Sequence, residues 1–143
     1  MILLDSGALI ALLVGEPAAG EVRSILRSGD ASIASANLAE AIDVLVRVFG
    51  NELPAVEAVL VPLLATSLPV EAIGEAEARK GAELRIVHYH RRSSPLSLAD
   101  CLLLGAAAVL GAAVASSDGH VVRAARSEDL EVLALKGSSG RRH

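Results

Sequence analysis

The sequence has almost no aromatic residues: one Phe, one Tyr and no Trp among its 143 residues. Because hydrophobic residues still make up 52% of the chain, its core must be built from Ala, Leu, Val and Ile. The single cysteine, Cys101, excludes an intrachain disulfide and is typical of a reducing compartment. Basic residues are also few. The formal net charge of −4 excludes a protein that binds nucleic acid by bulk positive charge alone.

Long apolar runs are missing as well. The first four residues lack a basic flank and are too few for the apolar region of a signal peptide. The most apolar later stretch, residues 102–115, is interrupted by Gly105 and Gly111 and falls short of the roughly 18 apolar residues of a membrane span. We therefore expect a soluble, cytoplasmic protein with no membrane association.

What the sequence does contain is a carboxylate at the end of its first apolar run. Residues 2–4 have the pattern of a buried strand, Asp5 follows at once, and residues 6–14 have helical spacing. In open parallel α/β sheets, ligands bind outside the carboxyl ends of the strands. The position of Asp5 therefore predicts a functional carboxylate and raises the question of which other acids share that edge.

Strands and helices alternate along the rest of the chain. Strands are expected at 2–4, 31–34, 67–70, 112–116 and 130–135, and Pro69 favours an edge position for the third. Helices are expected at 6–14, 17–28, 35–49, 55–64, 71–87, 97–110 and 120–126. This order predicts an α/β protein, a three-layer α/β/α sandwich around a mostly parallel sheet of about five strands. We expect one domain over residues 1–135 and a disordered tail over 136–143.

Three more acids occupy positions equivalent to that of Asp5. Asp118 follows the fourth strand, and Glu40 and Asp100 fall in the first turns expected for their helices. Taken alone, each has a structural explanation: Asp100 as a helix cap, Asp118 as a turn former and Glu40 as a solvated helix residue. In a parallel sheet, however, all four lie on the same edge.

Four crowded carboxylates repel one another unless a cation joins them. Mg²⁺ and Mn²⁺ prefer oxygen ligands, and Mg²⁺ takes only one or two direct carboxylates and keeps several waters. Such a site suits in-line attack on a phosphodiester. Ser6 and Ser116 flank the acids and are expected to support them as accessory hydrogen-bonding residues.

Four segments together resemble the motifs of PIN-domain ribonucleases, and most closely those of VapC-type toxins of bacterial toxin–antitoxin pairs. They are Leu4-Asp5-Ser6-Gly7-Ala8-Leu9, Asn37-Leu38-Ala39-Glu40, Leu96-Ser97-Leu98-Ala99-Asp100 and Ser116-Ser117-Asp118. The resemblance covers the chain to about residue 135. It implies an α/β/α sandwich, RNA cleavage that depends on Mg²⁺ or Mn²⁺, a homodimer and an antitoxin partner. By motif position it makes Asp5 and Asp100 the direct metal ligands, with Glu40 and Asp118 acting through water.

Two other families of α/β proteins do not fit the sequence, and two alternatives within the PIN fold stay open. A haloacid-dehalogenase-type phosphatase needs a second Asp where this chain has Gly7. A response-regulator receiver would use Lys136, but the expected strand 67–70 has no Asp to phosphorylate. A catalytically inactive PIN scaffold and a stand-alone PIN nuclease without an antitoxin are the serious alternatives.

Several other residues invite a functional interpretation. Arg91 and Arg92, beside His88 and His90, form the most basic stretch, and we expect this loop to meet RNA phosphates, with a plain solvated loop as the alternative. The two histidines lack the further ligands of a zinc site. Asp43 is expected to be an exposed helix acid, and Cys101 a buried thiol.

Two interfaces are also expected. An apolar groove beside the first two helices would accept an amphipathic partner segment, with candidate residues Leu9, Leu12, Leu13, Val22 and Ile25, which otherwise belong to the core. The helices at 55–64 and 71–87 are the candidates for a two-fold dimer contact.

Overall fold

The computed structural model describes residues 1–137. Its sheet has five strands, all parallel, in the order β3-β2-β1-β4-β5. The strands are β1 (Ile2–Leu4), β2 (Ala31–Ala34), β3 (Val70–Glu71), β4 (Ala113–Ser116) and β5 (Val132–Ala134). The α/β architecture expected from the sequence is thus confirmed.

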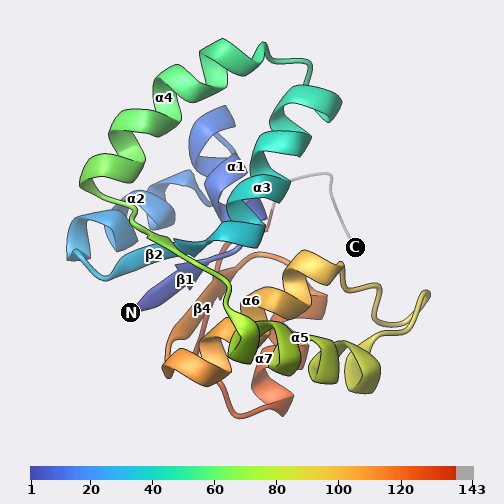
Figure 1. Cartoon of the computed structure of the whole chain (residues 1–143). Coiled ribbons are helices and arrows are strands. Elements are labelled where there is room, and N and C mark those ends of the chain that lie inside the picture. The colour runs from blue at the N-terminus through green and yellow to red at the C-terminus, as the bar shows by residue number, and fades with distance from the viewer. Residues whose placement is uncertain (138–143) are drawn as a thin grey trace.

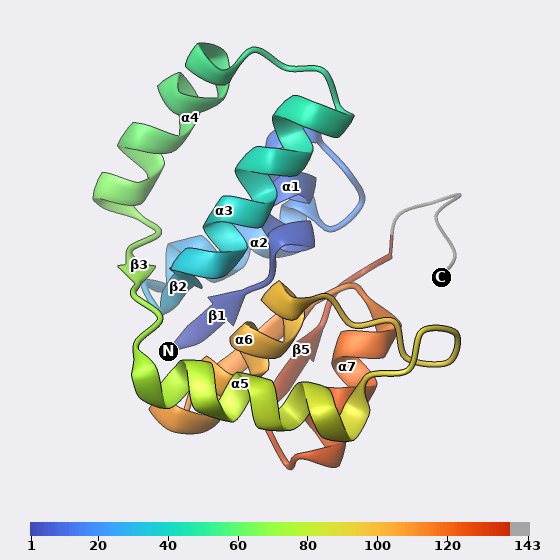
Figure 2. The ribbon, with the colours of Figure 1, turned by 45° about the vertical axis from the view of Figure 1, so that its right-hand side comes forward.

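Helices cover both faces of the sheet, as Figures 1 and 2 show. On one side lie α1 (Ser6–Val14), α2 (Ala19–Ser28) and α3 (Ser35–Asp43), with the π-helical turn η1 (Val44–Val48) and α4 (Leu53–Thr66) beyond them. On the other side lie α5 (Glu75–His88), α6 (Leu98–Leu110) and α7 (Gly119–Ser127). None of the helices in residues 1–137 is long and apolar enough to cross a membrane.

The central strand β1 joins two hydrophobic cores. Leu4 packs into the core under α1, α2 and α3, and Leu3 packs into the core under α5, α6 and α7. Both side chains are fully buried. Each therefore contributes roughly 1.5–3 kcal/mol of hydrophobic stabilisation, and β1 is fixed at the centre of the molecule. The residue that follows, Asp5, is held in place by both cores.

Some element boundaries differ from those expected. Pro17 lies in a turn and α2 begins at Ala19. The third strand lies at Val70–Glu71 instead of 67–70, although it does occupy the sheet edge. The helix expected from residue 71 begins at Glu75, because the backbone N–H of Gly74 donates to Glu77 Oε1 at 2.7 Å and fixes the helix start there. Of the tail expected to be disordered, 136–143, the first two residues are described, and the backbone N–H of Lys136 donates to Glu21 Oε1 at 2.8 Å. The rest of the expected tail lies outside the described residues.

Helix α6 is held against α5 by unusually close backbone contact. A Cβ atom on Gly105 would lie 2.5 Å from the backbone nitrogen of Gly81 and 2.7 Å from the backbone oxygen of Glu77. Neither atom can move without shifting α5 as a whole. The glycine therefore permits an approach between the helices that any larger residue would block.

We predict that Gly105→Ala destabilises the protein by about 1–3 kcal/mol through overpacking. The matched control is Gly20→Ala on α2, where a Cβ atom would have nothing within 4 Å. Because alanine loses less conformational freedom than glycine on folding, the control is expected to be neutral or to stabilise by up to about 1 kcal/mol. Chemical denaturation of both variants measures the difference, and equal stabilities would contradict the importance of this helix contact.

Candidate active site

An open cavity of about 510 Å³ lies where the parallel strands end. Its wall contains all four acids expected from the sequence, Asp5, Glu40, Asp100 and Asp118. The topology explains their meeting, because β1, β2 and β4 are adjacent and parallel, so the segments that follow them leave the sheet on one side. The predicted convergence of the four carboxylates is therefore present in the structure.

Three of the acids are positioned in the same way, by the beginning of a helix. Asp5 caps α1 and its Oδ1 accepts the N–H of Ala8 at 2.7 Å. Asp118 caps α7, and its Oδ1 accepts the N–H of His120 at 2.8 Å. Each bond uses one carboxylate oxygen, so the second oxygen can serve another partner. The structural interpretation of these acids as caps and the functional one are thus compatible.

Asp100 is held by a reciprocal pair of bonds at the start of α6. Its Oδ2 accepts the N–H of Ser97 at 2.9 Å, while the Ser97 hydroxyl oxygen accepts the N–H of Asp100 at 3.0 Å. The predicted capping box is present. The cap fixes the direction of the Asp100 side chain and places it near the positive end of the α6 dipole.

Glu40 is positioned differently from the expectation. Because α3 begins at Ser35, Glu40 lies in its second turn, not its first. Its carboxylate reaches the cavity with the help of Ser6, whose hydroxyl donates to Glu40 Oε1. Ser6 thereby connects the acid on α3 to the start of α1.

Ser116 connects two further acids. Its side chain is fully buried at the end of β4, and its hydroxyl oxygen accepts the backbone N–H of Asp118 at 3.0 Å. A hydrogen bond between Ser116 and Asp5 also lowers the pKa of Asp5, against the larger effect of burial. Both serines named from the sequence thus contact members of the acidic set, while their part in catalysis stays a prediction.

The site carries negative charge that no cationic side chain among the described wall residues balances. Burial, together with the charges of Asp100 and Asp118, raises the pKa of Asp5 to about 7. Burial and the charges of Glu40 and Asp118 raise the pKa of Asp100 to about 6. Within residues 1–137, no Lys, Arg or His lines the cavity. At neutral pH the arrangement therefore favours the binding of a cation.

The carboxylates of the cavity are oxygen donors, the ligand type that a hard divalent cation prefers. Within residues 1–137 no group of three or more His, Cys, Asp or Glu side chains is arranged to hold a metal ion. This is compatible with Mg²⁺, which uses one or two carboxylates and keeps its waters. It does not fit a structural zinc site, which needs four converging ligands.

Sequence reasoning missed several residues of the cavity wall. Glu16 is a fifth acid, contributed by the turn between α1 and α2, and the pattern around it indicates only a helix break. Phe49 and Val44 lie at the two ends of the π-helical turn η1, and both line the cavity. No local pattern identifies these residues, because they reach the site only through the path of α3 and η1.

Other candidate residues lie elsewhere. Asp43 forms an exposed ion pair with Arg47 at 2.9 Å, as expected for a surface helix acid. Cys101 is fully buried, and burial raises the pKa of its thiol to about 11, which makes it unreactive. His88 pairs with Glu128 at 2.6 Å. Arg91 and Arg92 do not line the acidic cavity.

The raised pKa values predict how stability depends on pH. The folded protein holds protons on Asp5 and Asp100 at pH values where the unfolded chain, with carboxyl pKa values near 4, has lost them. The metal-free protein should therefore lose stability as the pH rises from about 4 to about 7. Added Mg²⁺ should restore part of the loss at neutral pH by binding the ionised form.

Thermal unfolding in EDTA across this pH range measures the effect. Asp5→Asn keeps a side-chain oxygen for the Ala8 N–H but removes the buried charge. It should flatten the pH dependence and unfold at a higher temperature than the native protein at pH 8. A wild-type unfolding temperature that rises steadily from pH 4 to pH 8 would contradict the raised pKa values of Asp5 and Asp100.

The comparisons place these features in a known family. The family model described as "PIN domain" matches residues 2–127. Solved structures with the same fold include FitAcB from Neisseria gonorrhoeae, which is 23% identical with a TM-score of 0.64, covering 93% of this chain and 96% of that one. No curated protein sequence matches the chain.

Two further structures are similar over nearly all of their length. VapC20 of Mycobacterium tuberculosis, a Sarcin-Ricin loop cleaving toxin, is 20% identical with a TM-score of 0.67, covering 87% of this chain and 95% of that one. VapBC2 from Rickettsia felis, bound to a promoter DNA fragment, is 16% identical with a TM-score of 0.71, covering 95% and 100%. At these identities the likeness shows a shared fold. The family match, which spans the four acids, supports a nuclease class of activity, and the chain belongs to the PIN-domain family.

Proposed function

We propose that this protein is a ribonuclease that hydrolyses RNA phosphodiester bonds with Mg²⁺ or Mn²⁺, and that it is the cytoplasmic toxin of a toxin–antitoxin pair. The observation that carries the proposal is the cavity in which four carboxylates converge without a cationic side chain among the described wall residues. An inactive PIN scaffold has no need for such a costly arrangement. The similarity in fold to a Sarcin-Ricin loop cleaving toxin supports RNA as the substrate.

The role proposed for each acid follows its motif position in the PIN-domain resemblance. Asp5 and Asp100 would hold the metal ion directly, and Glu40 and Asp118 would act through water. When bound, the ion supplies an activated water and charge stabilisation at the phosphate. Ser6 donates to the Glu40 carboxylate and Ser116 bonds the Asp5 carboxylate, while the Asp118 carboxylate accepts the backbone N–H of His120, so the carboxylates are oriented before substrate arrives.

We predict that the isolated protein cleaves RNA only when Mg²⁺ or Mn²⁺ is present. Asp5→Asn and Asp100→Asn should each reduce cleavage by about a hundredfold or more, because each removes a metal-binding charge and little volume. The matched control is Asp43→Asn, which removes an exposed acid from α3 that lies outside the cavity. Gel assays with EDTA, Mg²⁺ or Mn²⁺ measure cleavage. Undiminished cutting in EDTA would refute the metal mechanism.

An antitoxin would need an apolar surface away from the acids, and the structure contains one. A groove of about 220 Å³ lies between the end of α1, η1 and α4, with Leu13, Val14, Leu45, Asn51, Ala55, Val56 and Val59 in its wall. Of the groove residues expected from the sequence, Leu13 is in this wall. Leu9 and Val22 are fully buried and Ile25 nearly so, so the predicted groove was wrong for these three residues. Leu12 is partly buried against the same core and is not in this groove wall.

An amphipathic partner helix would bury its apolar face in this groove. Structures with the same fold include VapBC from Salmonella typhimurium bound to DNA and a toxin-antitoxin complex from Klebsiella pneumoniae. These complexes support the proposal that the chain has a protein partner, and the groove is the binding site that we propose for it. A cationic side chain of that partner that reached the acidic cavity would compete with the metal ion.

We predict that Val59→Glu weakens antitoxin binding at least tenfold while RNA cleavage continues, because Val59 is 51% exposed and lines the groove. Val61→Glu is the matched control, since Val61 is 59% exposed on the same helix but outside the groove wall. Calorimetric titration with the product of the adjacent gene measures binding. If that product neither binds nor inhibits the native protein, a stand-alone nuclease is the better interpretation.

We also propose that the protein forms a two-fold dimer through α5. On this helix Ile86 is 84% exposed and Val87 is 66% exposed, an unusual amount of apolar surface for a free helix end. Light scattering should give twice the chain mass of 14.6 kDa, and Ile86→Glu should give the monomer. A native monomer at micromolar concentration would contradict the dimer.

A further inference from the structure

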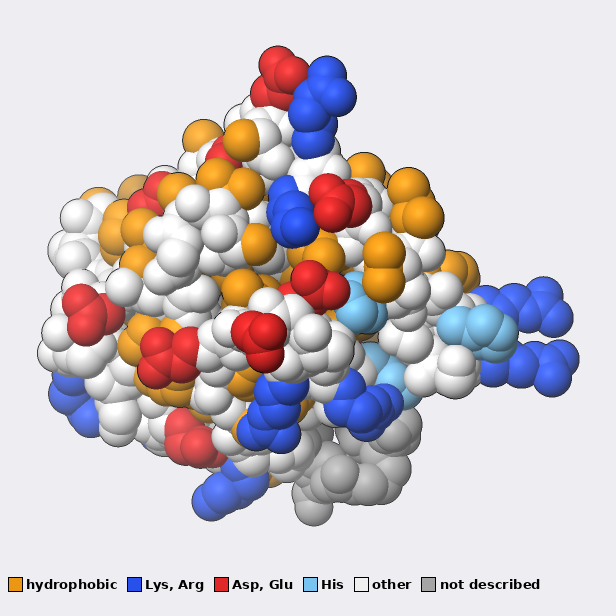
Figure 3. All heavy atoms as spheres, turned by 90° about the horizontal axis from the view of Figure 1, so that it is seen from below, with side chains coloured by type: hydrophobic (Ala, Val, Ile, Leu, Met, Phe, Trp, Pro, Cys, Tyr) orange, Lys and Arg blue, Asp and Glu red, His pale blue; other side chains and the backbone are white. Residues whose placement is uncertain are grey.

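The loop between α5 and α6 carries two adjacent cationic side chains. It includes Arg91 and Arg92, both exposed, and within residues 1–137 neither forms an ion pair. No Asp or Glu occurs between residues 89 and 99. Figure 3 shows Lys, Arg and His side chains gathered at the tip that this loop forms on one side of the molecule. The charge is therefore available to an external anion.

The loop is built as a defined turn. The backbone N–H of His90 donates to Ser94 O at 2.9 Å, and the N–H of Ser94 donates to His90 O at 2.9 Å. The His90 ring closes the turn from inside, because its Nδ1 accepts the N–H groups of Arg92 at 3.2 Å and Ser93 at 3.3 Å. Arg91 and Arg92 therefore project from a turn that hydrogen bonds hold in one conformation. This reduces the backbone entropy lost when the two side chains bind a ligand.

Both ends of the loop are anchored to the body of the protein. Leu96 is buried in the core under α5 and α6, and Arg85 donates from Nε and Nη2 to Leu96 O at 3.4 Å. The Arg85 guanidinium also lies over the ring of Tyr89, 4.4 Å from its centroid. The next residue after Leu96 is Ser97, which caps α6 and lines the acidic cavity. The loop is thus rigidly joined to the wall that carries Asp100.

The tip of the loop encloses a shallow hollow of about 510 Å³ whose wall is formed by Tyr89, His90, Arg91 and Arg92. An aromatic ring beside two guanidinium groups is the combination that binds single-stranded nucleic acid, through base stacking and phosphate contacts. The placement of Tyr89 is informative, because the chain has only two Phe, Tyr or Trp residues and uses neither in its core. Tyr89 is 42% exposed, and Phe49, in the wall of the acidic cavity, is 40% exposed.

We infer that the 89–94 loop is an RNA-binding arm, in which Arg91 and Arg92 bind backbone phosphates of a single-stranded segment beside the one that enters the acidic cavity. The inference rests on the proposed ribonuclease function. No Lys, Arg or His lies among the described wall residues around Asp5, Glu40, Asp100 and Asp118. These four carboxylates repel a polyanion until a metal ion binds, so a cationic element next to the cavity would help to attract RNA. The arm is one such cationic element, and Ser97 joins it to the cavity wall. Arg123 on α7, close to the wall residue Gly119, is another.

The test measures RNA binding apart from cleavage. A fluorescein-labelled single-stranded RNA is titrated with the Asp5→Asn protein in EDTA, and with the same protein carrying Arg91→Ala and Arg92→Ala. Loss of two phosphate contacts should raise the Kd about tenfold or more. It should also reduce the slope of log Kd against log salt concentration by about 1.4. His90→Ala keeps both arginines but removes the two hydrogen bonds that the His90 ring accepts within the turn. It should raise the Kd by a smaller factor.

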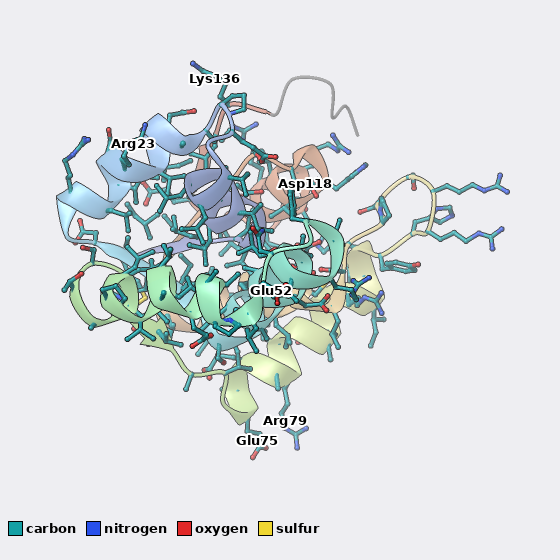
Figure 4. All side chains as sticks on the ribbon, turned by 90° about the horizontal axis from the view of Figure 1, so that it is seen from above. Arg23, Glu52, Glu75, Arg79, Asp118 and Lys136 are labelled. Carbon is teal, nitrogen blue, oxygen red and sulfur yellow. The ribbon has the colours of Figure 1, made fainter. Side chains whose placement is uncertain are left out.

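The matched control is the pair Arg23→Ala and Arg27→Ala on α2, which removes the same charge. Figure 4 shows Arg23 on the opposite side of the molecule from the loop, and Arg27 follows one helical turn later. This pair should leave the Kd nearly unchanged. If both double variants raise the Kd equally, RNA binds through bulk charge alone, and the proposal of an RNA-binding arm is wrong.

Two more outcomes decide between the proposals. If the Kd for RNA and its salt dependence are unchanged in the Arg91→Ala, Arg92→Ala protein, the loop is not an RNA-binding arm. The same conclusion follows if this protein loses antitoxin binding but keeps RNA binding. If the native protein binds RNA through the loop but cleaves none with Mg²⁺ or Mn²⁺, the arm stands and the ribonuclease function fails.

Discussion

The burial of carboxylates beside one another in the acidic cavity is the constraint on which the rest of this structure depends. Asp5 is buried and Asp100 half-buried near two other acids, and desolvation, with mutual repulsion as the smaller cause, raises the pKa of both carboxyl groups. The fold holds this charge by placing three of the acids at helix N-termini, where a backbone N–H and the helix dipole stabilise an anion. A cavity that is unstable when empty and ionised is a strong cation binder.

The helix N-termini keep their relative positions only because the helices and strand that carry them are rigidly packed. Helix α6 carries Asp100, and its approach to α5 is so close that Gly105 has no room for a side chain. Strand β1 leads directly into Asp5 and is clamped by Leu3 and Leu4 in two separate cores. With almost no aromatic side chains, this packing comes from Ala, Leu, Val and Gly, whose small size lets backbones approach closely. The precision of the site therefore follows from the composition of the core.

The sequence predicted the elements that are set by local patterns and missed those set by the path of the chain. The four acids were found because each follows a strand or lies in the first two turns of a helix, and parallel strands bring such positions together. Glu16 was missed because the turn that delivers it to the cavity has no pattern of its own. The helix expected from residue 71 begins later because Gly74 and Glu77 fix the start of α5, and Val70–Glu71 pairs with β2 instead. Leu9 and Val22 looked like groove residues because an apolar helix in sequence does not show which face the core covers.

The negative charge of the cavity and the positive charge of the 89–94 loop lie on different parts of the molecule. The residues that would perform hydrolysis are acidic and repel the substrate, and the chain as a whole carries −4. Cations inside the cavity would pair with the acids and displace the metal ion, so the charges that attract RNA have to lie outside it. The loop with Arg91 and Arg92 satisfies this condition, since it is joined to the cavity wall by Ser97 but faces solvent. The same logic makes the cavity vulnerable, because a partner that brings one cation into it would neutralise the acids and exclude the metal together.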